Sequence, residues 1–448
     1  MEAELTTGPV GKTLMRLTSP MVYGLLAVIS LNLVDTYFIA RLGTDELAAV
    51  SFTFPIVMIL MNLTLGLSIG AGSIISRAVG GGDKERVKRL TTDSLVFSFC
   101  LMMILMYLGQ IAIYPLFTLM NAPASLLPHI HSYMHIWYYG LPLMAVPIVG
   151  NAAINSMGDM KLPGLMMLIA AIVNLILDPL LIFGYWGFPR MEIAGAAVAT
   201  LFSYGIAFCI SVADLSLRKK MLSSNLKLEE MIESWRDLLK VALPASASQM
   251  IVPLTSSITV WMLGFFGPAV VAGYGIVSRL EAFSLIVVIG MATSLSAFVG
   301  QNWGAGHYQR AVQGIRIGYI FAIFWGLAIA FVLFMGSRFV PQFFNPDPEV
   351  VGTVGQYLMY VPLSYCAAGS LFVTNSYLNA IGKSHAVAVI SLCRYFVLYL
   401  PLAVVAMSYF GPIGIFGVIS LVNFAAGIGG YFWGKSFLVK KIDLLASN

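Results

Sequence analysis

The sequence predicts an all-α integral membrane protein of twelve transmembrane helices, arranged as two six-helix lobes related by pseudo-two-fold symmetry. Three observations lead to this prediction. Hydrophobic residues make up 59% of the 448 residues and charged residues only 10%, whereas soluble domains carry about 25% charged residues. Apolar windows of about 20 residues recur along the whole chain. The second half of the chain repeats landmarks of the first half.

The apolar windows predict where the spans lie. We expect them at 13–40, 48–77, 92–119, 131–156, 163–186, 194–216, 238–266, 270–301, 314–337, 352–380, 384–408 and 413–438. Several of these windows are longer than the roughly 20 residues that a bilayer requires, so we expect tilted or kinked helices.

Basic residues predict the orientation of these spans. Lysine and arginine gather between spans 2 and 3 and between spans 6 and 7, and few lie in the connections on the other side. Because basic loops stay on the cytoplasmic side, we expect a multi-pass protein of the bacterial inner membrane with both termini in the cytoplasm.

An internal repeat predicts the two lobes. A shift of 224 residues, the difference between Pro20 and Pro244, also aligns a set of further residues: Gly66 with Gly290, Arg86 with Arg310, Asn151 with Asn375 and Asn155 with Asn379. Because each half holds an even number of spans, both halves begin on the same side, which implies a symmetry axis along the membrane normal and a central cleft. We expect an N-lobe at 1–216, a cytoplasmic linker with a short amphipathic helix at 217–237, and a C-lobe at 238–448.

Two carboxylates lie inside predicted spans of the N-lobe. Asp35 and Asp178 interrupt apolar segments, where a charge costs roughly 2.5–3.5 kcal/mol on insertion scales. A shift of 224 aligns Asp35 with Thr259, and a shift of 222, which aligns Pro179 with Pro401, places Asp178 on Leu400. The second half therefore lacks both acids. Counting residues along each helix puts both acids in the outer half of the membrane, and Asn174 lies one turn from Asp178 on the same face. These positions predict one polar cluster.

This cluster has three possible roles. Two nearby carboxylates in a low dielectric cannot both stay ionised cheaply, which makes a proton-binding site. The same oxygens could instead hold Na⁺, or the side chains could only join helices by hydrogen bonds. We favour proton binding.

Other residues of the predicted spans have either a structural role or a role near a site. Pro20 and Pro244 could be packing kinks or a hinge near a site. For Arg279 and Glu281 we expect buried ion pairs with other spans, and Arg394 either extends toward the interface or lines the C-lobe.

Structural roles also account for the aromatic residues and the cysteines. Tyr133, Trp137, Tyr138 and Tyr139 fit an interfacial aromatic belt. The four cysteines, Cys100, Cys209, Cys366 and Cys393, fit core thiols.

The sequence lacks signatures of other classes of protein. It contains no Walker A motif, no G-x-S-x-G and no usual zinc spacing. We therefore expect no enzyme, no metal centre, no nucleic-acid partner and no cofactor beyond H⁺ or Na⁺ as a coupling ion. Without an ATP site, uphill transport would use an ion gradient.

Several motifs together resemble the multidrug and toxic compound extrusion (MATE) transporters, along essentially the whole chain. They are Pro20 with Asp35, the glycine-rich stretch 70–82 and its echo at 299–306, Asn155-Ser-Met-Gly158-Asp, and Asn174-x-x-x-Asp178-Pro179. The sequence looks like the DinF branch, which uses acids on spans 1 and 5. It lacks the acid that the NorM branch has on span 7, where this chain has Gln249.

The resemblance implies roles for particular residues. Asp35, Asp178 and Asn174 would bind the coupling cation, Tyr133 and Asn151 would belong to the N-lobe network or contact substrate, and Pro20 would be the bend in span 1.

The function we expect is that of a monomeric, cation-coupled antiporter, driven by H⁺ and exporting amphiphilic or cationic compounds by alternating access. The alternatives are Na⁺ coupling and a flippase of lipid-linked oligosaccharides from the same broad superfamily. Its partners would be these small molecules and the lipid bilayer.

Overall fold

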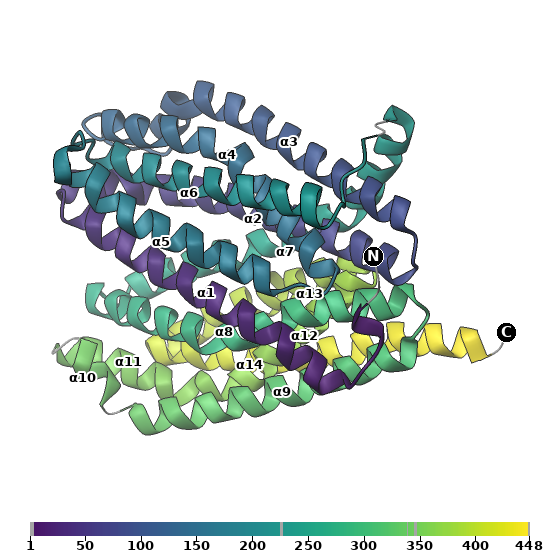
Figure 1. Ribbon diagram of the computed structural model, residues 1–448. Helices are drawn as coiled ribbons and strands as arrows, with labels where there is room; N and C mark the ends of the chain where they lie inside the picture. The colour runs from purple at the N-terminus through teal and green to yellow at the C-terminus, as the bar shows by residue number, and fades with distance from the viewer. Residues whose placement is uncertain (1–3, 225–226, 338, 345–346, 447–448) are drawn as a thin grey trace. The chain divides into compact units, whose positions relative to one another are not determined.

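The computed structural model describes residues 4–224, 227–337, 339–344 and 347–446, which are helical almost throughout and contain no β-strand. The long helices before the middle of the chain are α1 (Val10–Ala40), α2 (Thr44–Gly80), α3 (Lys84–Leu119), α4 (Leu127–Ser156), α5 (Lys161–Phe183) and α6 (Ile193–Ala213). The later helices are α7 (Leu228–Gly264), α8 (Pro268–Gly304), α9 (Tyr308–Gly336), α10 (Val340–Phe344), α11 (Pro348–Tyr360), α12 (Tyr365–Ala380), α13 (Ser384–Leu392) and α14 (Leu400–Ala446) (Figure 1).

The helices confirm the predicted all-α membrane fold with twelve spans. Ten helical stretches among the described residues are long and apolar enough to cross a membrane. One of them, Ser384–Val439, has 56 residues and breaks at Gly411, where φ is 61°, so it supplies two spans. The helix α4 is not one of these ten stretches, but its 30 residues also suffice to cross a bilayer.

Two expectations about exposure are wrong. Tyr133, Trp137 and Tyr138 do not form an interfacial belt, because α4 packs against α2, α3 and α6 and these three rings are buried in the core. Among the four aromatic residues only Tyr139 is exposed. The cysteines are free, as expected, but three of them, Cys100, Cys209 and Cys393, are exposed, since an apolar helix of a membrane protein also presents apolar residues to lipid.

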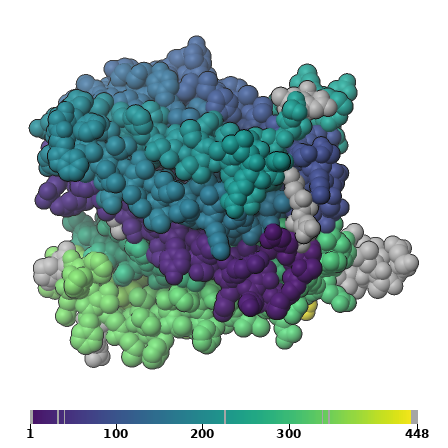
Figure 2. All heavy atoms as spheres, in the orientation of Figure 1, coloured from purple at the N-terminus to yellow at the C-terminus, as the bar shows by residue number. Residues whose placement is uncertain are grey.

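The chain divides into two compact units by its packing. Unit 1 contains Ser19–Ser246, and unit 2 contains Glu4–Thr18 together with Ala247–Asn448. Figure 2 shows the first residues of the chain, in dark purple, against green residues of unit 2. Both α1 and α7 therefore pass from one unit to the other within a single helix, at positions close to Pro20 and Pro244. The predicted lobes at 1–216 and 238–448 differ from these units in the two exchanged segments.

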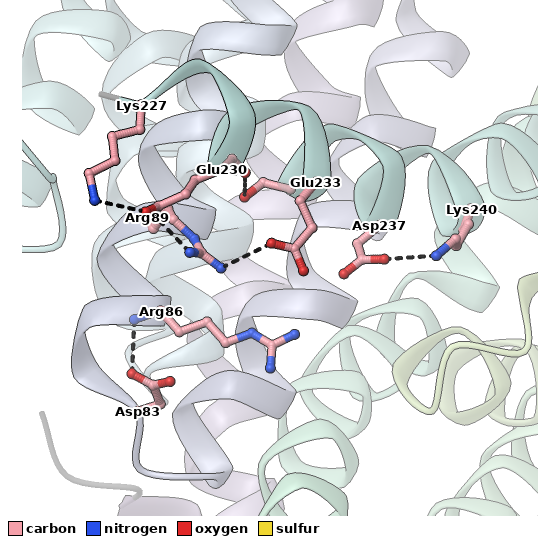
Figure 3. Close-up of polar contacts among 9 residues, drawn as sticks. Asp83, Arg86, Arg89, Lys227, Glu230, Glu233, Asp237 and Lys240 are labelled. Carbon is pink, nitrogen blue, oxygen red and sulfur yellow. Dashed lines mark hydrogen bonds and ion pairs between the residues drawn. The ribbon is translucent and has the colours of Figure 1, made fainter. Parts of the chain in front are cut away.

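The start of α7 is bound to α3 within unit 1 (Figure 3). Arg89 of α3 forms ion pairs with Glu230 at 3.1 Å and Glu233 at 3.8 Å. Trp235 donates its indole N–H to the Asp93 carbonyl at 2.9 Å. The amphipathic helix expected in the linker is thus the first part of α7, which continues without interruption into the next span.

Close backbone packing holds the next turns of α7 in unit 1 as well. A Cβ atom on Gly66 of α2 would come within 2.6 Å of the Ser246 backbone, and one on Gly70 within 2.8 Å of the Ala242 Cβ. Any larger side chain at Gly66 would have to displace backbone, so this glycine permits the close approach of α2 and α7.

In unit 2 an arginine binds the first residues of the chain. The Arg310 guanidinium donates to the carbonyl oxygens of Leu5, Thr7 and Gly8, the last two at 2.6 and 2.7 Å. The side chains of Gln301 and Asn302 bind the N–H and the carbonyl of Leu5, both at 3.1 Å. The segment Glu4–Thr18 is therefore bound to α8 and α9 through its backbone.

Asp159 stabilises the connection between α4 and α5. It accepts hydrogen bonds from Lys219 Nζ at 2.7 Å and from the N–H groups of Lys161 and Leu162 at 3.2 and 3.3 Å. Burial raises the pKa of Asp159, but the bond and charge of Lys219 and the two backbone bonds outweigh it, so the pKa lies below its usual value.

Candidate ion-coupling site

Asp35 and Asp178 lie at matching depths in unit 1. Asp35 is five residues before the end of α1, and Asp178 is five residues before the end of α5. Both helices run in the same direction through the membrane, because three spans separate α1 from α5. At about 1.5 Å per residue, each acid lies about 8 Å from its helix end.

The structure brings the two acids together. Their carboxyl groups are close enough to interact with each other, and Asp178 is completely buried. Both oxygens of Asp178 and Oδ1 of Asp35 have no hydrogen-bond partner among the described residues. Two carboxylates so placed would repel each other in a medium of low dielectric, and one shared proton or a bound cation would remove that repulsion.

Polar side chains from α4, α5 and α6 surround this carboxyl pair. Asn174, one turn before Asp178, is buried and donates to Thr200 of α6 at 3.5 Å. The Tyr133 phenol of α4 is close enough to interact electrostatically with both carboxyls and with Tyr204 of α6. The site therefore combines two carboxyls, one amide, one hydroxyl and two phenols.

The chain's topology explains why these residues meet. Tyr133 and Thr200 lie six and seven residues after the starts of α4 and α6, which run opposite to α1 and α5. All four helices thus contribute residues at a similar distance from one membrane face. The sequence did not predict a role for Thr200 and Tyr204, because α6 contains no charged residue that would have drawn attention to it. The available signal was their spacing of four residues, which places both on one face of α6.

Pro20 lies at the contact between α1 and α5. A Cβ atom on Gly164 would come within 2.4 Å of the Pro20 carbonyl oxygen, and one on Gly24 within 2.9 Å of the Gly164 Cα. The Pro20 ring removes one backbone N–H from the helix, fifteen residues before Asp35 and one residue after α1 enters unit 1.

Asn151 is not part of the carboxyl cluster. It lies on α4 eighteen residues after Tyr133, which corresponds to about 27 Å along the helix. Its Oδ1 is buried without a hydrogen-bond partner among the described residues. If Asn151 contacts substrate, it does so at a position separate from the Asp35 and Asp178 cluster.

The intramembrane charges of unit 2 differ from the expected ion pairs. Glu281 accepts a hydrogen bond from Tyr357 at 2.6 Å, and Arg394 donates to Asn423 at 2.6 Å. Arg279 is exposed, eleven residues into α8. Among the described residues, the ion pairs within 4.0 Å involve none of these three residues, and no group of three or more His, Cys, Asp or Glu side chains could hold a metal ion.

Comparison with known proteins defines the class of this protein. The MatE family model matches residues 20–180 and 244–405, one match for each half of the internal repeat. The chain belongs to this family and is a multi-pass MATE transporter.

Individual relatives extend over nearly the whole chain. The FAD transporter of Shewanella oneidensis is 36% identical over 429 residues, which cover 96% of this chain and 95% of the relative. The probable multidrug resistance protein YoeA of Bacillus subtilis is 26% identical, over 84% of this chain and 82% of the relative. A crystal structure of a mutant of the Vibrio cholerae MATE transporter VcmN superposes with a TM-score of 0.92 at 30% identity, over 96% of this chain and 97% of that one.

Proposed function

We propose that this protein is a cation-coupled exporter of small molecules, with H⁺ as the coupling ion. The observation that carries the proposal is the pair of buried carboxyls, Asp35 and Asp178, which has no basic partner in the cluster described above. A membrane transporter without an ATP-binding motif needs an ion-binding group of this kind if an ion gradient is to drive the movement of its substrate.

Exchange of substrate against a proton follows from the charge of this pair. When one proton bridges the carboxyls, the pair carries one negative charge; a second proton neutralises it, and loss of the bridge leaves two charges that repel. Each change alters how α1 is held against α5. Pro20 provides a weak point in α1 at which the helix can bend in response, so that protonation would be converted into movement during alternating access.

The available driving force is sufficient for useful export. For an uncharged substrate, one H⁺ that crosses a potential of 100 mV supplies about 2.3 kcal/mol, which corresponds to a roughly 50-fold concentration ratio, and a pH gradient adds to this value. Exchange of one H⁺ for one monovalent cation moves no net charge, so the pH gradient alone drives the export of such a cation.

Sodium coupling is the alternative for the same site. Carboxyl, amide and hydroxyl oxygens from Asp35, Asp178, Asn174 and Thr200 would suit a hard cation. The interaction of the two carboxyls with each other supports the proton, because one shared proton can join two carboxyl groups without further ligands, whereas Na⁺ needs several oxygen ligands around it.

Transport into everted membrane vesicles tests the proposal. With ethidium as the probe, an imposed H⁺ gradient should drive accumulation and an imposed Na⁺ gradient alone should not. Asp35→Asn should abolish the driven component. Asp45→Asn is the matched control, since Asp45 is an exposed acid at the start of α2 in the same unit. Driven transport by Asp35→Asn equal to that of Asp45→Asn would refute the assignment.

The substrate has a second candidate class. Relatives named as multidrug proteins support amphiphilic cations, whereas the 36% identical relative is named a FAD transporter. An anionic nucleotide requires a cationic contact inside the membrane, and the exposed Arg279 could provide it; the flippase alternative would make the same demand for its pyrophosphate. Everted vesicles supplied in parallel with external ethidium or FAD distinguish these classes, and Arg279→Gln should weaken only FAD transport.

A further inference from the structure

Glu281 is an acidic residue that the proposed coupling site does not use. It lies thirteen residues into α8, about 20 Å along the helix and thus well inside the membrane. Its Oε2 accepts a hydrogen bond of 2.6 Å from the Tyr357 hydroxyl of α11. A carboxylate at such a depth is costly unless it is neutralised, so this side chain needs either a proton or a cationic partner.

A cationic partner is close but bound elsewhere. The Arg394 guanidinium interacts electrostatically with Glu281, yet its Nη2 donates to Asn423 Oδ1 at 2.6 Å. The Arg394 Nε is buried and has no hydrogen-bond partner among the described residues. This arrangement leaves one donor of the guanidinium without a hydrogen bond, and the Glu281 carboxyl is hydrogen-bonded to the Tyr357 phenol.

The surroundings of Arg394 allow it to change partner. Residues Cys393–Tyr399 form a π-helical segment between α13 and α14, and such segments are frequent at functional sites. Asn423 would not lose all its bonds if Arg394 left, because its Nδ2 donates to Ser364 Oγ at 2.8 Å. The Arg394 guanidinium also lies over the Tyr395 ring, 4.7 Å from its centroid, and this cation–π contact stabilises its charge independently of Asn423.

We propose that Glu281 is a second proton-binding site of this protein, separate from the Asp35 and Asp178 pair, and that Arg394 is its exchangeable counter-charge. In the protonated state the Glu281 carboxyl is neutral, bonds Tyr357, and leaves Arg394 on Asn423. In the ionised state the proton has left to water, and Arg394 moves from Asn423 onto the carboxylate.

The ionisable groups around Glu281 are consistent with this two-state description. Tyr274 on α8, Tyr357 on α11, Tyr365 on α12 and Arg394 act on it electrostatically. The three phenols are neutral in the physiological range, so Arg394 is the charge among them that can compensate the carboxylate. Arg279 is exposed and lies two residues before Glu281 on α8. Residues two apart on a helix point to different faces, so Arg279 does not face the Glu281 carboxyl.

Infrared difference spectroscopy of the purified full-length protein tests the site without transport. The carbonyl stretch of protonated carboxylic acids is followed while pH is raised. Glu281→Gln keeps an acceptor for Tyr357 and should lose one component of this signal, and Glu281→Asp should retain one at a shifted frequency. Arg394→Gln should keep the component to more alkaline pH. Glu349→Gln, which removes an exposed acid at the start of α11, should change nothing.

The outcomes distinguish the Glu281 proposal from the proposed coupling function. Proton binding by Glu281 does not depend on that function; only a role of Glu281 in transport does. If Glu281→Gln and wild type give the same difference spectrum, or if Arg394→Gln leaves the component unmoved, the proposal is overturned. The component that Asp35→Asn and Asp178→Asn remove should survive in Glu281→Gln. Should vesicle transport prove independent of ion gradients while the Glu281 component is still lost, the coupling function fails and the site stands.

Discussion

The two units place their buried acidic side chains in different surroundings. In unit 1, Asp35 and Asp178 interact with each other, and an amide, a hydroxyl and phenols surround them. In unit 2, Glu281 and Arg394 carry opposite charges and lie near each other. Glu281 is nevertheless hydrogen-bonded to Tyr357, and Arg394 to Asn423. The internal repeat relates the two halves of the chain, but it does not relate these clusters.

This difference shows which cluster depends on an added cation. A like-charged pair is stabilised when a proton or a metal cation joins it, so we expect unit 1 to bind an ion from its surroundings. The acid and base of unit 2 can neutralise each other, so its response to a proton is a change of internal partners. We therefore expect changes in unit 1 to abolish coupling and changes in unit 2 to alter stability or pH dependence.

The largest expected effect comes from breaking the carboxyl pair. Asp35→Asn and Asp178→Asn should each reduce proton-driven accumulation of ethidium in everted vesicles by about tenfold or more. Because the acids act as one site, the double variant should be no worse than either single variant. Multiplying losses in the double variant would mean that the acids work independently.

Introducing the missing acid into unit 2 should reduce stability without adding a coupling site. Thr259, the repeat counterpart of Asp35, is buried and bonds the Tyr399 hydroxyl at 2.7 Å. Thr259→Asp should cost about 2.5–3.5 kcal/mol, because its carboxylate would lack a second acid or a cation. Thermal unfolding in detergent measures this, with Thr259→Val as the control at about 1 kcal/mol. An acid tolerated at no cost would show that the clusters are interchangeable.

The two exchanged helical segments offer a smaller comparison. Arg310 binds three backbone carbonyls of Glu4–Thr18, whereas Arg89 binds two partly exposed carboxylates of α7. Arg310→Ala should cost about 1.5–3 kcal/mol and open the N-terminal segment to limited proteolysis. Arg89→Ala should cost at most about 1 kcal/mol. Equal losses of thermal stability would contradict the ranking.

The smallest expected effect concerns Asp159 and Lys219. The pKa of Asp159 is lower in the folded protein than the usual aspartate value of about 3.9, so its stabilisation is present above that pH and disappears as the pH falls through the lowered pKa. Asp159→Asn should therefore be less stable than wild type at neutral pH, by about 1 kcal/mol. The difference should shrink steadily as the pH falls below about 3.9. Unfolding curves at neutral and at acid pH measure it, and a difference that does not shrink in acid would exclude the ionic contribution.

The sequence predicted the spans and the carboxyl pair because both leave a signal in a single chain. Long apolar windows identify helices, and an aspartate within one is conspicuous; counting residues then placed Asp35 and Asp178 at the same depth. Asn174 followed from its i, i+4 spacing.

Other features depend on packing that a single sequence does not reveal. Thr200 reaches Asn174 only because α6 lies beside α5, and Arg394 reaches Asn423 because α14 folds back. The exchange of Glu4–Thr18 between units lies inside one unbroken helix, so hydropathy gave no boundary there.

The most direct test of the central claim is to count protons exchanged at the carboxyl pair. Ethidium and FAD are each added to purified protein in weakly buffered detergent solution, and a pH indicator reports the protons released. Wild-type protein should release about one proton per bound molecule of the substrate it recognises, and Asp35→Asn should bind that compound with no release. Equal release from wild type and Asp35→Asn would contradict the account.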